Sequence, residues 1–166
     1  MSAYDAAGWQ NFYVMVGGAA AALTGLLFVA MSLHAKAIIA DPLHGSRAVG
    51  TLLSLMTQLF VAGTVLIPQS TMMLGTEVEV AALLSLVQSV RGVVVTLRTA
   101  KRRVRSRIRT TLEGIGAAIW IVLFVASGIS LIAHAGGGLY LLAAVMPFMF
   151  GWNVYVAWVL ITEISD

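Results

Sequence analysis

The sequence alternates five long apolar stretches with short polar connections. The first, residues 12–33, contains no Asp, Glu, Lys or Arg. An α-helix of this length covers roughly 33 Å, enough to cross a hydrocarbon core of about 30 Å. The chain is 60% hydrophobic and only 10% charged, which is too apolar for an ordinary soluble domain. We therefore expect an all-α integral membrane protein.

The apolar stretches predict a single transmembrane domain over residues 1–166. Its five predicted spans are residues 12–33, 49–67, 77–97, 112–133 and 139–161. Three glycines, Gly136 to Gly138, separate the last two spans and predict a tight turn with an antiparallel helical hairpin. Pro147 interrupts the fifth span and predicts a kink.

A basic segment, residues 98–109, predicts the orientation of the chain. It carries seven of the ten Lys and Arg residues, and the loop after the first span carries two more. Such cations concentrate in the short cytoplasmic loops of membrane proteins. Five spans place both basic loops in the cytoplasm, with the N-terminus outside and the C-terminus inside. Four spans would put the two loops on opposite sides of the membrane.

The same segment predicts the partners of the charged surface. A net charge of +3 would suggest nucleic acid in a soluble protein, but these cations adjoin membrane segments. Anionic lipid headgroups are therefore the expected partner, and nucleic acid is not. If the third helix continues unbroken, five arginines fall within roughly 60° of arc. They are Arg91, Arg98, Arg102, Arg105 and Arg109.

Polar side chains inside the spans are expected to face protein or water rather than lipid. They are Gln58, Ser85, Gln88, Arg91 and Asn153. Interhelical hydrogen bonds are one explanation, and a pore or hydrated interior is the other. An ion pair with Glu113, near the start of the fourth span, would lower the cost of placing Arg91 below the headgroups.

Small residues recur every four positions in the first span, at Gly17, Ala21 and Gly25. Such ridges allow two helix backbones to approach closely in lipid. The partner helix belongs either to the same chain or to another subunit, so self-association is one expected outcome.

No combination of side chains indicates an enzyme or a cofactor. The absence of cysteine excludes disulfides and thiolate sites. His34 and His44 are ten residues apart with only Asp41 between them, so we interpret them as solvated loop residues rather than metal ligands. Glu77 and Glu79 fall at the start of the third predicted span, so both carboxylates are expected near a membrane boundary.

Two stretches are similar to a known family. One runs from Gly25 to Leu33 (GLLFVAMSL), and the other is Leu66-Ile-Pro-Gln-Ser70, with Leu74-Gly75 and Glu77 downstream. They resemble small uncharacterised bacterial multi-span proteins, found especially in actinobacteria, some of which are labelled modulators of the FtsH membrane protease. The family pattern has Gly after the Pro, where this chain has Gln69. The resemblance implies a multi-pass protein of the bacterial inner membrane and transfers no catalytic residue.

Two function classes remain. The first is a homo-oligomeric channel for small ions, lined by the polar face of the third span and favouring anions through its arginines. The alternative is a non-catalytic interaction protein that binds another membrane protein through Gly17, Ala21 and Gly25.

Overall fold

The fold is described by a computed structural model that covers residues 3–99 and 106–165, with side chains for residues 3–98 and 114–163. Within these residues the chain is helical and has no strand. In order, the elements are η1 (Ala6–Trp9), α1 (Gln10–Leu33), α2 (Ala35–Ala40), α3 (Pro42–Leu66), α4 (Thr71–Thr99), α5 (Ser106–Ala133) and α6 (Leu139–Ser165). Five of them are long and apolar enough to cross a membrane, as predicted.

Three helices, α3, α4 and α5, begin six or seven residues earlier than the sequence pattern suggested, and polar residues cap the first two. The Asp41 side chain accepts a hydrogen bond from the Leu43 amide at 2.8 Å, and Pro42 occupies the first helical position of α3. Ser70 Oγ accepts from the Met73 amide at 3.2 Å at the start of α4. The predicted loop at 34–48 therefore contains α2 and the first turns of α3, and the turn before α4 is shorter than expected.

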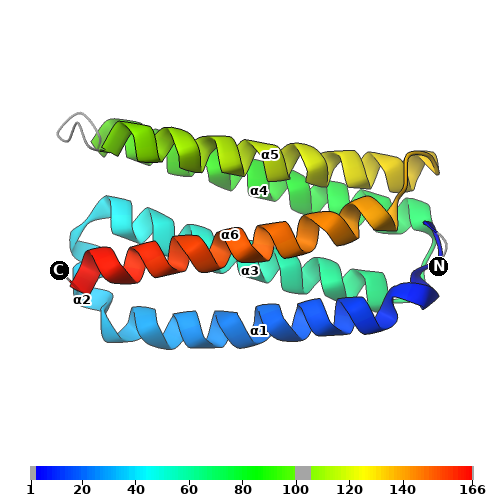
Figure 1. The fold of residues 1–166 in the computed structure, drawn as a ribbon, viewed down its shortest axis with the longest axis horizontal. Coiled ribbons are helices and arrows are strands. Elements are labelled where there is room, and N and C mark those ends of the chain that lie inside the picture. The colour runs from blue at the N-terminus through cyan, green and yellow to red at the C-terminus, as the bar shows by residue number, and fades with distance from the viewer. Residues whose placement is uncertain (1–2, 100–105, 166) are drawn as a thin grey trace.

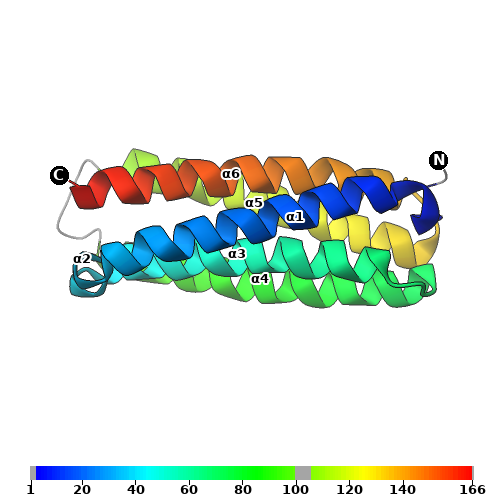
Figure 2. The same ribbon diagram turned by 90° about the horizontal axis from the view of Figure 1, so that it is seen from below.

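The five long helices lie side by side, and their ends gather at two opposite ends of the molecule (Figures 1 and 2). We call one the N-terminal end, where α1, α4 and α6 begin. The other, the basic end, holds α2, the start of α5 and the end of α6. Helix α3 is central, because it packs against α1, α4 and α6, while α5 packs against α4 and α6.

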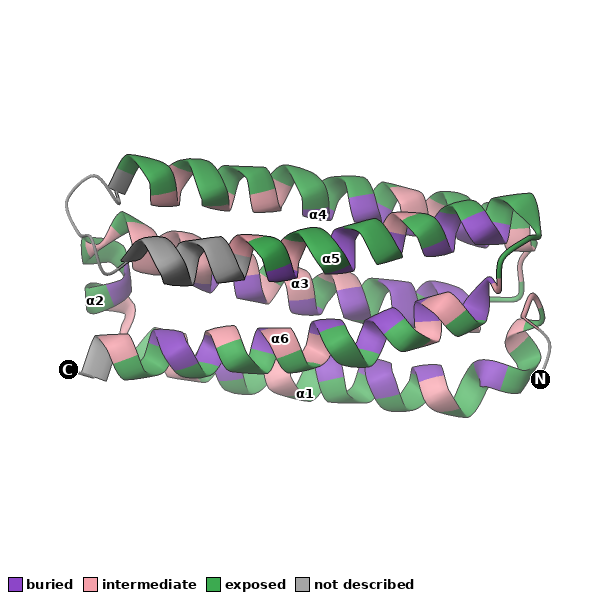
Figure 3. Cartoon of the chain, turned by 45° about the horizontal axis from the view of Figure 1, so that its top comes forward, coloured by how far each residue is buried: buried purple, intermediate pink, exposed green. Residues whose placement is uncertain are grey.

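The hydrophobic core is concentrated toward the N-terminal end. Its largest fully buried side chains include Tyr13, Phe124 and Met146. On α4 the buried positions end at Ser85, and no residue from 86 to 98 is buried (Figure 3). The half of α4 toward the basic end therefore contributes little to the core of this chain.

The α5–α6 connection forms the predicted hairpin. Gly136, Gly137 and Gly138 all have positive φ (84°, 107° and 43°), a conformation that side chains with a Cβ rarely adopt. The turn is held by the Ser130 hydroxyl, which accepts from the Gly138 amide at 2.8 Å, and by the Tyr4 hydroxyl, which accepts from the Gly137 amide at 3.2 Å. Helix α6 then continues through Pro147 to the basic end.

Helices α4 and α5 approach backbone to backbone at Gly75. A Cβ added there would lie 3.0 Å from both the Gly128 carbonyl oxygen and the Ile132 amide nitrogen. Backbone atoms cannot rotate away as a side chain can, so glycine is required for this close crossing.

Replacing Gly75 with alanine should therefore separate the two helices. We expect the Gly75→Ala variant to lose about 1–3 kcal/mol of stability, the typical cost of forcing a methyl group into a filled space. Thermal unfolding in mild detergent, followed by circular dichroism, measures the loss. Gly63→Ala is the matched control, since an added Cβ at Gly63 meets no described atom within 4 Å. Equal unfolding temperatures for the two variants would contradict the close crossing.

Candidate functional site

The interface between α3 and α6 contains two polar links. Asn153 Nδ2 donates to Ser54 Oγ at 2.9 Å, and Asn153 is only 3% exposed. Nearer the basic end, Arg47 Nη1 donates to Glu163 Oε2 at 2.6 Å. The predicted polar interior at Asn153 is therefore an interhelical hydrogen bond within one chain.

Gln58 differs from Asn153, because its expected interhelical hydrogen bond is absent. The side chain is completely buried, and neither its amide nitrogen nor its amide oxygen has a partner within the described residues. Gln58 lies one turn beyond Ser54 on α3. The residue at the same level of antiparallel α6 is Met149, one turn before Asn153, and its side chain has no hydrogen-bond donor. An unpaired buried amide costs about 1–3 kcal/mol.

The polar face of α4 turns toward its own chain. Ser85 is buried, and Gln88 Nε2 donates to the Val49 carbonyl of α3 at 3.4 Å. Farther along, the Thr96 hydroxyl bonds the Gly92 carbonyl of its own helix at 2.8 Å. Ser85 and Gln88, two residues of the predicted pore lining, thus lie against other helices of the same chain.

Arg91 is exposed and does not belong to the interior of the chain. Since Gln88 bonds Val49 and the two helices are antiparallel, Arg91 stands level with Arg47, near the start of α3. From Arg47 to Leu66, the last residue of α3, the rise is about 28 Å, close to the thickness of a hydrocarbon core. Arg91 therefore lies toward the basic end of the bundle.

The rest of the predicted arginine stripe can be followed only to Arg98, which is also exposed. Arg102 and Arg105 lie outside the described residues, and the side chains of Arg109 and Glu113 are not described. The stripe beyond Arg98 and the Arg91–Glu113 ion pair therefore stay predictions.

The small residues of α1 divide between two sides of the helix. A Cβ added at Gly17 would lie 3.2 Å from Ala62 Cβ, so Gly17 packs against α3. Gly25 is exposed, and an added Cβ there meets no described atom within 4 Å. Gly25 and its exposed small neighbours form what we call the small-residue face of α1. This face consists of Gly18, Ala21, Ala22 and Gly25.

The two acidic residues of α4 face different neighbours. Gln69 Nε2 donates to both the Thr64 carbonyl at 2.9 Å and Glu77 Oε2 at 2.8 Å, which ties Glu77 to the end of α3. Glu79 lies instead against Gly128 of α5. Its Oε1 atom is buried without a partner among the described residues.

Glu79 lies farther into its helix than the predicted span placed it. Because α4 begins at Thr71, Glu79 stands eight residues into the helix, about 12 Å from its start. The capping residue Ser70, directly after Pro68 and Gln69, is the sequence signal that would have placed the helix start correctly.

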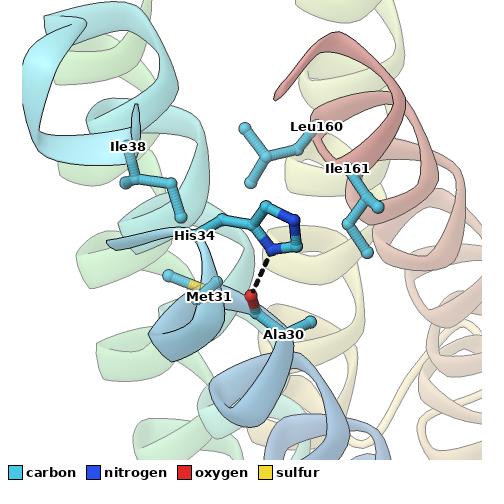
Figure 4. Close-up of a pocket in the computed structure, with 6 residues that line it drawn as sticks. All are labelled: Ala30, Met31, His34, Ile38, Leu160 and Ile161. Carbon is cyan, nitrogen blue, oxygen red and sulfur yellow. Dashed lines mark hydrogen bonds between the residues drawn. The ribbon is translucent and has the colours of Figure 1, made fainter. Parts of the chain in front are cut away.

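His34 and His44 make separate contacts, and His44 Nε2 lies 3.9 Å from Glu163 Oε2. His34 is half-buried, with Nδ1 2.9 Å from the Ala30 carbonyl oxygen. Its ring borders a cavity of about 10 Å³ against Leu160 and Ile161 of α6, hardly enough for one water molecule (Figure 4). His34 thus packs beneath α6 rather than in a solvated loop. Within the described residues, no three potential metal ligands come together.

Comparisons with protein-family models, curated proteins and solved structures found no match to this chain.

Removing the unpaired amide should stabilise the bundle. Methionine has nearly the volume of glutamine and no unsatisfied donor, so we expect Gln58→Met to raise the unfolding temperature in detergent. Asn153→Leu is the comparison, because it breaks the bond to Ser54 and should lower the temperature. A loss of stability in Gln58→Met would show instead that Gln58 binds a polar group.

Proposed function

We propose that this protein is a non-catalytic interaction protein of the bacterial inner membrane. In this proposal its N-terminal end faces outward and its basic end faces the cytoplasm. The small-residue face of α1 binds a second transmembrane helix. A second copy of the chain is the first partner to test, and the family resemblance makes a membrane protease the next.

The open positions of Gly18 and Gly25 carry this proposal. In lipid, helices associate by close backbone approach rather than by hydrophobic burial, so small residues have value where another helix covers them. Gly17 already serves that purpose against α3. At Gly18 and Gly25 an added Cβ meets no described atom within 4 Å, so contact within the described chain does not account for these glycines.

The charges of the basic end support the proposed orientation. Lys36, Arg91 and Arg98 are exposed there, and each cation near an anionic leaflet contributes about 1 kcal/mol of attraction. Anionic headgroups are therefore the second partner that we propose for this surface.

Large side chains on the small-residue face should block association. We expect Gly18→Leu and Gly25→Leu to reduce the oligomer in mild detergent or in vesicles, measured by light scattering or by energy transfer between labelled copies. Gly151→Leu is the matched control, because Gly151 is also exposed and open but lies on α6. A monomeric wild-type chain that also captures no membrane partner would overturn the proposal.

An assembled channel is the second candidate, favoured by the exposed cations of α4. Arg91 and Arg98 are seven residues apart and share one face, in the part of α4 that buries no residue. Copies assembled around α4 would line a path with these arginines and favour small anions. Gln58, Ser85 and Asn153 are buried within the subunit, so this lining would exclude them.

Anion flux into vesicles separates the two candidates. If α4 lines a channel, Arg91→Ala should reduce the preference for anions over cations, because a fixed positive charge leaves the path. Lys36→Ala removes an exposed cation from the same end but from α2, and should leave selectivity unchanged. Absence of flux above that of empty vesicles would leave the interaction protein as the supported function.

A further inference from the structure

Among the described residues, Glu79 is an acidic side chain that lies eight residues into a helix long enough to cross a membrane and against a neighbouring backbone. A Cβ added at Gly128 would overlap Glu79 Oε1 and lie 2.9 Å from the carboxyl carbon of Glu79. The carboxyl group therefore occupies the space that any other residue at position 128 would fill.

No Lys or Arg side chain that the structure describes lies near Glu79. In the sequence the ten Lys and Arg residues are Lys36, Arg47 and eight between positions 91 and 109, and those with described side chains lie toward the basic end. Arg109 is nineteen residues before Gly128 on α5, a rise of about 28 Å. An isolated carboxylate without a counterion is strongly disfavoured in hydrocarbon.

The other titratable groups near this layer are directed elsewhere. On α4 itself, Glu77 is bonded to Gln69. On α5, His134 lies six residues farther toward the N-terminal end, where its Nε2 is 2.6 Å from Thr71 Oγ1. On α3, the antiparallel register set by Gln88 and Val49 places uncharged Gln58 and Leu59 at the level of Glu79.

We propose that Glu79 is a proton-binding site within the membrane, and that it exchanges its proton with the aqueous phase at the N-terminal end. The proton removes the charge that this position cannot otherwise balance. The contact between α4 and α5 then contains a group that responds to protons, independently of any partner bound at α1.

Dicyclohexylcarbodiimide tests this proposal, since it is an apolar reagent that enters bilayers. A protonated carboxyl adds across its carbon–nitrogen double bond, and the adduct rearranges to a stable N-acylurea without losing any group. The full-length protein in vesicles is treated with the reagent, and the modified residue is mapped by mass spectrometry. We expect one adduct per chain, on Glu79, and loss of that adduct in Glu79→Gln.

Glu77→Gln is the matched control. Glu77 lies two residues away on the same helix, and its replacement should leave the adduct on Glu79 intact. Labelling of Glu77 in place of Glu79, or an undiminished adduct on the chain in Glu79→Gln, would overturn the proposal.

The wild-type chain supplies a second test that depends on no variant. Above its titration midpoint, the protonated fraction and hence the labelling rate should fall about tenfold for each pH unit. The reagent also hydrolyses at a rate that depends on pH. An added carboxylic acid of known pKa is therefore treated in parallel as the reference for this loss of reagent. Labelling that does not follow pH would overturn the proposal. Protection by sodium ions at constant pH would also overturn it, by identifying a metal cation as the occupant.

Discussion

Hydrocarbon offers no hydrogen-bond partner, and the rest of this structure depends on that constraint. Backbone groups satisfy one another within helices, so the spanning elements are helical. Polar side chains must likewise find partners inside the bundle. Asn153 meets Ser54 across the α3–α6 interface, and Gln88 reaches the Val49 carbonyl across α3–α4. Both bonds involve α3, which explains why this helix is central to the fold.

Three side chains do not satisfy this constraint within the described chain, and one of them is Tyr13, whose hydroxyl is buried without a partner. Gln58 is buried with both amide atoms unpaired, and Glu79 buries a carboxyl oxygen without a partner. The cases differ in chemistry. An amide cannot change its charge, so Gln58 must bind a polar group or reduce stability. A carboxyl can bind a proton, so Glu79 can become neutral where it stands.

The outer surface of the bundle depends on the same constraint in another way. Lipid does not drive apolar helices together, so association relies on shape. Within α1, Gly17 and Gly18 are adjacent in sequence but lie on different sides of the helix, because successive residues of a helix are about 100° apart. Gly17 fits α3, while Gly18 joins the exposed small-residue face. Toward the basic end, the part of α4 that buries no residue carries exposed Arg91 and Arg98, which give this surface its positive charge.

The sequence alone determined the helical class, the five helices long and apolar enough to cross a membrane, and the α5–α6 hairpin, because length, apolarity and glycine runs act locally. It misplaced the starts of α3, α4 and α5 by several residues, although Asp41 and Ser70 were visible as caps of the first two. Only the tertiary structure decided which side each helix turns inward. It directed Ser85 into the bundle and Arg91 out of it, and it set Glu79 against Gly128. The physical reason is that lipid and a protein core are both apolar, so an apolar pattern does not distinguish them.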